Sequence, residues 1–330
     1  MRVVYMGTPE IASGVLESVL AMRQNHPELE VVGVFTQPDK PVGRKQILTP
    51  PAVKVTAQAA GIPVYQPKRI KRPSQVEILK SLEPDLILVT AYGQILSQEI
   101  LDIPRLGCIN MHASLLPKYR GAAPINWVIV NDEEKTGVSA MLMDAGMDTG
   151  DMLMTREVPI EPDETADTLY DKLTREGSSL VCEVVEKLLA GEKLTRTKQD
   201  ASEATYAPII SKEDGLIDWT KSARAVDCMV RGFIGWPGAY SFLDGKKCTV
   251  MKARVLSEEA MAETGVEAET LETGRAVPAL LGGKRPRLVI RCGKDFLEIL
   301  ELQVQGKKAM ETRAFLNGYL AHDIVLSSNV

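Results

Sequence analysis

The sequence predicts two domains: an α/β domain with a Rossmann-like, doubly wound, mostly parallel sheet, followed by a small OB-like β-barrel. Three observations predict this fold class. Apolar strands alternate with amphipathic helices over residues 1–189. Residues 190–208 are polar and lack apolar periodicity, which is typical of a linker. Residues 209–330 carry short alternating strands with hairpin signals such as Asp244-Gly245.

The strands of the first domain are expected at apolar runs that are bounded by turn residues. Arg2–Met6 ends at Gly7-Thr8-Pro9 and leads into a helix whose apolar residues recur at helical spacing. The later strands are Val31–Thr36, Gly61–Tyr65, Leu86–Thr90, Cys108–Met111 and Val138–Met143. An amphipathic helix over Thr165–Leu189 ends the domain before Gly191. In the second domain we expect a helix over Ala223–Phe233. Two hairpins follow it, Ala239–Leu243 with Cys248–Ala253 and Leu288–Cys292 with Phe296–Leu302.

The composition is that of a soluble globular protein, with 330 residues, 45% of them hydrophobic and 25% charged. No apolar run approaches the roughly 20 residues of a membrane span, and the chain starts without a signal or transit peptide pattern. The 5 Cys are scattered without CxxC spacing, so we expect free thiols, no zinc site and a reducing, cytoplasmic location. The net charge of −5 argues against a generally basic nucleic-acid binder and leaves room for a local basic patch. We expect a monomer with no bound metal and no membrane association.

The stretch Gly107–Gly121, GCINMHASLLPKYRG, is the candidate active site. Because side chains alternate faces along a strand, Asn110 and His112 point the same way and Met111 points the other way. A neutral amide donor beside an imidazole suits attack on a carbonyl, where an oxyanion develops and a nucleophile loses a proton. The competing interpretation, a hydrogen-bonded structural His and a turn-forming Asn, has about equal weight on this pattern alone.

The ends of the strands place this pair where a doubly wound sheet binds ligands. Gly7-Thr8-Pro9, Ala91–Gln94 and His112–Pro117 all follow expected parallel strands. A dinucleotide site would need Gly-x-Gly-x-x-Gly after the first strand, and this turn has a single Gly followed by Thr and Pro. NAD and FAD binding are therefore not expected.

Two further loops each have a structural and a functional interpretation. Asp144–Asp151 is acidic and Gly-rich without calcium-loop spacing; it is either a structural turn or a loop that brings one carboxylate to the Asn/His pair. These residues alone do not say which Asp would do so. Gln37–Lys45 is basic and punctuated by Pro and Gly; it is either a solvated loop or a mobile loop that closes over an anionic partner.

The chain resembles the methionyl-tRNA formyltransferase family over its whole length. The matching motifs are MGTPE, VVGVFTQPDKPVGR, AYGQIL, GCINMHASLLPKYRGAAPIN, MDAGMDTGDML, SKEDGLIDW, GWPGAYSF and QGKKAM. The Asn-x-His-x-Ser-Leu-Leu-Pro core is shared with the wider formyltetrahydrofolate-using superfamily, and the match through the second domain points to the tRNA enzymes. The resemblance implies 10-formyltetrahydrofolate as co-substrate, initiator methionyl-tRNA as acceptor and a role in translation initiation.

The resemblance also implies site residues. The catalytic residues are Asn110, His112 and Asp148, and the folate-contacting turn is Ser114, Leu115, Leu116 and Pro117. The pterin is expected near Tyr92, Gly93, Gln94 and Ile95, the tRNA acceptor end near Lys40, Arg44 and Lys45, and the rest of the tRNA on the OB-like domain. Ile209 and Leu216 stand where the family carries Lys or Arg, which puts one or two phosphate contacts in doubt.

Two other functions stay open on the sequence. One is formyl transfer to a small-molecule amine such as an amino sugar, which predicts turnover without tRNA. The other is a non-catalytic RNA-binding protein on a degenerate scaffold, which predicts no folate binding. The intact Asn/His/Asp set speaks against the second.

Overall fold

The computed structural model describes residues 1–330 except 44, 263–271, 280–286, 319–323 and 328–330. The chain divides into two compact units, which we describe separately. The first unit comprises Met1–Pro124, Lys135–Pro159 and Thr168–Pro208, and the second comprises Ile125–Glu134, Ile160–Asp167 and Ile209–Val330. In the described part of the chain, no helix is long and apolar enough to cross a membrane.

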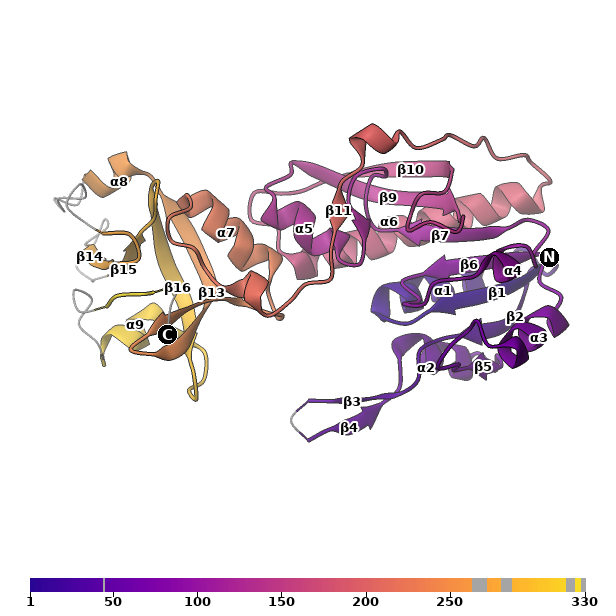
Figure 1. Cartoon of the computed structure of the whole chain (residues 1–330), viewed down its shortest axis with the longest axis horizontal. Coiled ribbons are helices and arrows are strands. Elements are labelled where there is room, and N and C mark those ends of the chain that lie inside the picture. The colour runs from indigo at the N-terminus through magenta and orange to yellow at the C-terminus, as the bar shows by residue number, and fades with distance from the viewer. Residues whose placement is uncertain (44, 263–271, 280–286, 319–323, 328–330) are drawn as a thin grey trace. The chain divides into compact units, whose positions relative to one another are not determined.

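A seven-stranded, mostly parallel sheet forms the first unit, in the order β10-β9-β7-β6-β1-β2-β5 (Figure 1). Its strands are β1 (Arg2–Gly7), β2 (Glu30–Phe35), β5 (Val64–Tyr65), β6 (Leu86–Thr90), β7 (Cys108–His112), β9 (Lys135–Leu142) and β10 (Met152–Pro159). The strands up to β7 run parallel, whereas β9 is antiparallel to β7 and β10 is antiparallel to β9. The predicted doubly wound fold is confirmed.

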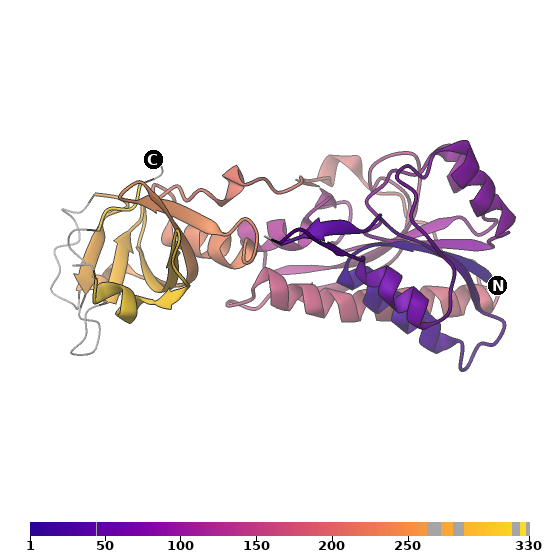
Figure 2. The same cartoon turned by 90° about the horizontal axis from the view of Figure 1, so that it is seen from below.

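Helices cover both faces of this sheet. They are α1 (Glu10–Met22), α2 (Ala52–Ala59), α3 (Pro73–Ser81), α4 (Gln98–Leu101) and α6 (Ala166–Leu189). Figure 2 shows α1 and the pink α6 together on one face of the sheet, and α1 approaches α6 where Gly14 meets Thr174. On the other face, Val76 and Leu79 of α3 and Ile100 of α4 share an apolar core with β1 and β6. This burial of apolar surface on both faces explains the nearly continuous hydrophobic runs of the central strands.

A small hairpin interrupts the basic loop after β2. The strands β3 (Lys40–Val42) and β4 (Ile47–Thr49) pair antiparallel. The sequence predicted only irregular structure here, because three-residue strands are too short to give a periodic pattern. Lys40 and Lys45 are exposed on this hairpin, and Arg44 lies outside the described residues.

An antiparallel sheet in the order β12-β13-β16-β15-β14 forms the second unit, with β17 beside β16. The strands are β12 (Ala239–Leu243), β13 (Lys246–Leu256), β14 (Ala276–Ala279), β15 (Arg287–Arg291), β16 (Phe296–Val304) and β17 (Met310–Glu311). The helices are α5 (Pro124–Val130), α7 (Ala223–Gly232), α8 (Glu258–Ala262) and α9 (Thr312–Leu316), and η2 (Glu213–Gly215) is a 3₁₀ turn. The backbone of Ser327 hydrogen-bonds to that of Phe242 in β12. The backbone of Ile324 bonds to Ala276, the first residue of β14, and that of Leu326 bonds to Gly274 just before the strand. One short segment thus joins both edge strands and closes the sheet as the predicted barrel requires.

Candidate active site

The carboxyl ends of β1, β6 and β7 meet at one edge of the first unit's sheet. The strand order reverses between β1 and β6, and β7 lies beside β6. Thr8, after β1, donates its hydroxyl to the carbonyl of Tyr92, after β6, at 3.0 Å. Doubly wound sheets bind ligands in the crevice at such a reversal. The residues that end β7 therefore lie at the edge of the sheet where a ligand is expected.

Asn110 and His112 lie on one face of β7, as the alternation predicts. Met111 points to the opposite face, where its side chain contacts Gly177 of α6. The two polar side chains are almost buried, Asn110 at 8% exposure and His112 at 6%. Within the described residues the Asn110 carboxamide makes no hydrogen bond to the protein. A nearly buried amide without a protein partner is unusual, because removing it from water costs free energy unless another hydrogen-bond partner, such as a ligand, replaces the water.

His112 has one nitrogen bound and one available. Its Nε2 lies 2.9 Å from the carbonyl oxygen of Tyr119. A carbonyl can only accept, so Nε2 carries the proton and the neutral ring is left with its lone pair on Nδ1. Nδ1 lies 3.7 Å from Oδ2 of Asp148, beyond ordinary hydrogen-bond distance. The ring can therefore take up a proton on Nδ1 and would then face a carboxylate.

Asp148 is the acidic residue of the Asp144–Asp151 loop that reaches the histidine. Its backbone is left-handed, with φ of 54°, and its Oδ2 accepts the backbone N–H of Gly121 at 2.8 Å. Asp144 instead accepts from Gly146 N–H and from the Thr149 hydroxyl, which holds the loop itself. The structure thus separates a carboxylate that faces the site from one that stabilises the turn. Among the described residues no group of three or more His, Cys, Asp or Glu side chains could hold a metal ion.

The Ser-Leu-Leu-Pro turn is held from β9. Ser139, which pairs with His112, donates its hydroxyl to the carbonyl of Ser114 and accepts the N–H of Leu116. Ser114 itself is fully buried and donates to the carbonyl of Lys118. Its side chain therefore shapes the turn, and the half-buried side chains of Leu115 and Pro117 are the more accessible ones.

The segment after β6 divides its residues between core and surface. Tyr92 belongs to the apolar core; its buried hydroxyl has no hydrogen-bond partner among the described residues, and burial raises the pKa of the phenol. The Gln94 amide bonds to the N–H of Ile70 and to the carbonyl of Pro67. Ile95 is 72% exposed and Gly93 has a φ of 81°. Of these four residues, Ile95 and the backbone of Gly93 are therefore the groups that a ligand could reach.

The base of the β3–β4 hairpin is tied to this segment. Gln37 donates its amide to the carbonyl of Tyr92, and Gln66 bonds to both the Gln37 carbonyl and Asp39. Lys54 donates to both oxygens of Asp39 at 2.8 Å. The bonds from Gln66 and Lys54 hold the pKa of the Asp39 carboxyl below its ordinary value. The structure thus connects the hairpin with the exposed lysines to the loop after β6.

Comparison with known proteins shows the family of the chain. A family model described as formyl transferase matches residues 1–185, and one described as formyl transferase, C-terminal domain, matches residues 209–320. The methionyl-tRNA formyltransferase of Geobacter sulfurreducens is 47% identical over 319 residues, which cover 97% of this chain and 94% of that protein. That of Citrifermentans bemidjiense is 46% identical over 319 residues, with 97% and 94% covered. The chain belongs to the methionyl-tRNA formyltransferase family. The family expected from the sequence motifs is confirmed.

Solved structures of other formyltransferases share the fold of this family member. The sugar 3N-formyl transferase WlaRD, solved in the presence of dTDP and 5-N-formyl-THF, superposes with a TM-score of 0.63 at 18% identity and covers 93% of this chain and 99% of that chain. The N-formyltransferase from Helicobacter canadensis, in complex with folinic acid and dTDP-3-aminofucose, has a TM-score of 0.62 at 19% identity and covers 90% and 97%. At these identities the likeness shows the fold alone.

Several groups at the candidate active site were missed from the sequence. The carbonyl of Tyr119 and the N–H of Gly121 fix His112 and Asp148, and Ser139 holds the turn. Backbone groups leave no residue-type signal, so only the structure could reveal them. Gln199, whose amide contacts the Asp148 loop, lies in the segment predicted as a linker. Its only signal was its place in a polar stretch without apolar periodicity, which predicted a linker.

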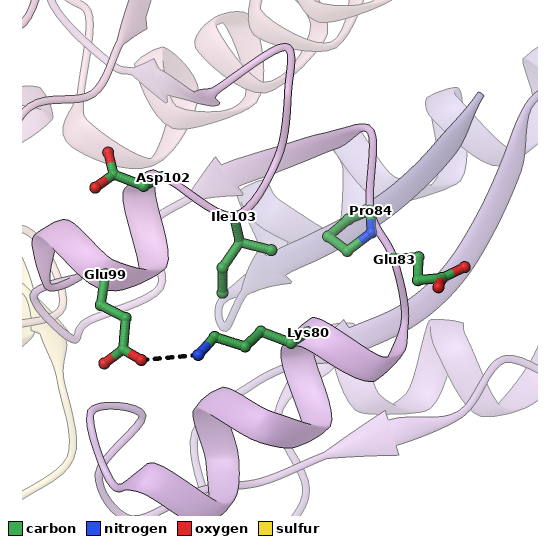
Figure 3. Close-up of a pocket in the computed structure, with 6 residues that line it drawn as sticks. All are labelled: Lys80, Glu83, Pro84, Glu99, Asp102 and Ile103. Atoms are coloured by element: carbon green, nitrogen blue, oxygen red, sulfur yellow. Dashed lines mark hydrogen bonds and ion pairs between the residues drawn. The ribbon is translucent and has the colours of Figure 1, made fainter.

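A separate hollow of about 400 Å³ lies near the amino ends of β6 and β7 (Figure 3). It is lined by Lys80, Glu83, Pro84, Glu99, Asp102 and Ile103, and Lys80 reaches across it to Glu99. Ligands of doubly wound sheets bind at the opposite ends of the strands, and the ammonium of Lys80 in this hollow is already engaged by Glu77 and Glu99. The β7 edge is therefore the candidate active site.

Proposed function

We propose that this protein transfers the formyl group of 10-formyltetrahydrofolate to the α-amino group of initiator methionyl-tRNA, giving N-formylmethionyl-tRNA for translation initiation. The observation that carries the proposal is the relationship to methionyl-tRNA formyltransferases over 97% of the chain, second unit included. A formyltransferase for a small amine is less supported, because the sugar formyltransferases share only 18–19% identity.

Asn110 would supply the electrophilic assistance. The formyl donor brings an acyl carbon to the site, and attack by an amine places negative charge on the formyl oxygen. Two N–H donors of the Asn110 amide have no partner in the described protein, so they are free to bind that oxygen. Donors already fixed in a nearly buried site need no reorganisation during the reaction, which makes them effective there.

His112 and Asp148 would handle the proton. The attacking amine must be neutral and must lose a proton as its new bond forms, and the lone pair on His112 Nδ1 can accept it, directly or through a water. The resulting imidazolium would donate one N–H to the Tyr119 carbonyl and turn the other toward the Asp148 carboxylate, which lies 3.7 Å away and attracts its charge. Asp148 would therefore stabilise the charged ring and fix its orientation. As the tetrahedral adduct collapses, the bond between the formyl carbon and N10 of the folate would break, and the imidazolium would return its proton to N10 of the departing tetrahydrofolate.

The folate would lie against the groups that the structure leaves accessible at this edge. These are Leu115 and Pro117 of the turn, with the buried Leu116 between them and Ser114 holding the backbone, and the loop of Gly93 and Ile95 beside Tyr92 and Gln94. An apolar turn and loop beside an unpartnered amide fit a flat pterin ring with its polar edge. Ser114, Tyr92 and Gln94 would act by holding these backbones.

The tRNA would be bound by two regions. The exposed Lys40 and Lys45 on the β3–β4 hairpin, with Arg44 between them in sequence, would approach the acceptor end, and the barrel over residues 209–330 would bind the rest. We keep 1–189 as the catalytic domain and 190–208 as the connecting segment. We also propose that the protein acts as a monomer in the cytoplasm, in keeping with its free cysteines.

The test is formyl transfer from 10-formyltetrahydrofolate to three acceptors compared side by side: charged initiator methionyl-tRNA, free methionine and a dTDP-linked amino sugar. Rapid formylation of the charged tRNA alone is the expected result. Turnover of the amino sugar without tRNA would favour the alternative. Folate binding with no turnover of any acceptor would show that the proposed acceptor is wrong.

A further inference from the structure

Arg120 of β8 (Arg120–Gly121) is a buried cation next to the active site. It is 4% exposed, and its guanidinium donates from Nε at 3.1 Å and from Nη2 at 2.7 Å to a single atom, Oε1 of Gln199. Within the described residues it forms no ion pair with a carboxylate. Burying a charge with only an amide partner costs free energy, so stability alone is a poor reason for this arrangement.

The arrangement fixes the orientation of the Gln199 amide. A guanidinium can only donate, so the atom that it contacts must be the amide oxygen. The nitrogen of the same amide then points away and donates to two carbonyl oxygens, that of Asp148 at 2.9 Å and that of Gly150 at 2.7 Å. Since both carbonyls can only accept, a flipped amide would lose every one of these bonds.

The loop that receives these bonds needs support. Asp148 has a left-handed backbone, with φ of 54°, which a non-glycine residue adopts at a cost. Gly150 packs so closely on the carbonyl of Leu142 that a Cβ would lie 1.8 Å from that oxygen. Gln199 bonds to both residues and so holds the backbone that carries the Asp148 carboxylate.

The network returns to the histidine through the neighbours of Arg120. Tyr119, on one side, accepts from His112 Nε2, and Gly121, on the other, donates to Asp148 Oδ2. The segment 197–207 holds this stretch from outside, because the Thr205 hydroxyl accepts the N–H of Tyr119 and β11 (Tyr206–Ala207) pairs with β8. Three consecutive residues thus touch His112, Gln199 and Asp148.

We propose that Arg120 and Gln199 are positioning residues for catalysis: Arg120 orients the Gln199 amide, and the amide sets the place of Asp148 relative to His112. This inference deepens the proposed formyl transfer and rests on it. It also gives the 190–208 segment a role in the active site. Neither residue is expected to contact the substrates, so their loss should affect turnover more than binding.

The first test is Gln199→Glu, which keeps size and the acceptor for Arg120 but replaces the donor to the loop with a carboxylate oxygen. We expect kcat to fall about 10- to 100-fold, as displacement of a catalytic group by a fraction of an ångström to an ångström does. The KM values for folate and for tRNA should change by less than about threefold. Lys198→Gln is the matched control, because it makes the same change of net charge at the neighbouring exposed residue and should behave as wild type.

The second test is a double-mutant cycle with Arg120→Lys. If Arg120 acts through Gln199, the double variant should lose no more activity than Gln199→Glu alone. Additive losses, or a folded Gln199→Glu variant whose kcat stays within about threefold of wild type, would overturn the proposal.

A readout without turnover separates this inference from the proposed function. If the wild type formylates no acceptor, the proposed function fails. The imidazole ¹⁵N signals of His112 then test the positioning role of Gln199 without any turnover. We expect these signals to move in folded Gln199→Glu while those of His26, which lies outside the site, do not. Unchanged His112 signals would refute the positioning role.

Discussion

Replacement of Asp148 by Asn removes the charge that faces His112 and leaves the loop intact. The carboxylate accepts the N–H of Gly121 at 2.8 Å, and an asparagine oxygen can accept the same bond. What the variant loses is the attraction between a carboxylate and the imidazolium that forms when His112 takes the proton. The change therefore tests electrostatics more than folding.

The size of the effect follows from the 3.7 Å between His112 Nδ1 and Asp148 Oδ2. At an effective dielectric constant of about 20, unit charges at this distance attract by about 4 kcal/mol, or about three powers of ten in rate. If half of the charge has developed in the transition state, the loss is about 2 kcal/mol, a factor of about 30. We therefore expect kcat to fall between about 30- and 1,000-fold, with much smaller changes in KM.

The assay is single-turnover formylation of charged methionyl-tRNA with saturating 10-formyltetrahydrofolate, after thermal unfolding has shown that the variant is folded. Asp151→Asn is the matched control, because it removes the same charge from the same loop and its side chain makes no hydrogen bond or ion pair among the described residues. A folded Asp148→Asn variant that keeps kcat within about threefold of wild type would refute the role of this carboxylate.

Three further changes test other parts of the site and of the chain. Asn110→Ala should lower kcat about 10²- to 10³-fold, the usual cost of one oxyanion donor, in steady-state kinetics; a fall in kcat/KM that comes from KM alone would contradict the role. Joint replacement of Lys40 and Lys45 by Ala should weaken tRNA binding and reduce the slope of log affinity against log salt by about one for each phosphate that a lysine no longer neutralises, and an unchanged slope would exclude the hairpin. Iodoacetamide at pH 8 should modify the native protein slowly, because burial raises the pKa of the Cys108 thiol to about 12 and that of Cys182 to about 11, which leaves little of the reactive thiolate. Labelling is measured by mass spectrometry against a denatured sample. Rapid labelling of the folded protein would show that these thiols are not protected.

The sequence was informative where the signal is local. The common face of Asn110 and His112 follows from the two-residue repeat of any strand, and the buried central strands are continuous apolar runs. The strand β10 was not predicted, because it lies at the sheet edge and most of its residues are partly or fully exposed. An edge strand with few buried positions gives little periodicity.

The remaining parts of the site depend on contacts between distant segments. Tyr119 and Gly121 act through backbone groups that every residue carries, so their types say nothing of their partners. Residues 190–208 are polar, which indicates solvent exposure, yet Gln199 turns its amide inward to two loop carbonyls. Polarity alone cannot distinguish hydration from a hydrogen-bonded interior position.

The measurement that most directly tests the central claim compares wild type with His112→Ala in a single turnover with charged initiator methionyl-tRNA, alongside equilibrium binding of the folate. If Asn110, His112 and Asp148 form the catalytic site, folate affinity should stay within about threefold while the rate of formyl transfer falls at least about 100-fold. Formyl transfer at the wild-type rate by a folded His112→Ala variant would contradict the proposed site.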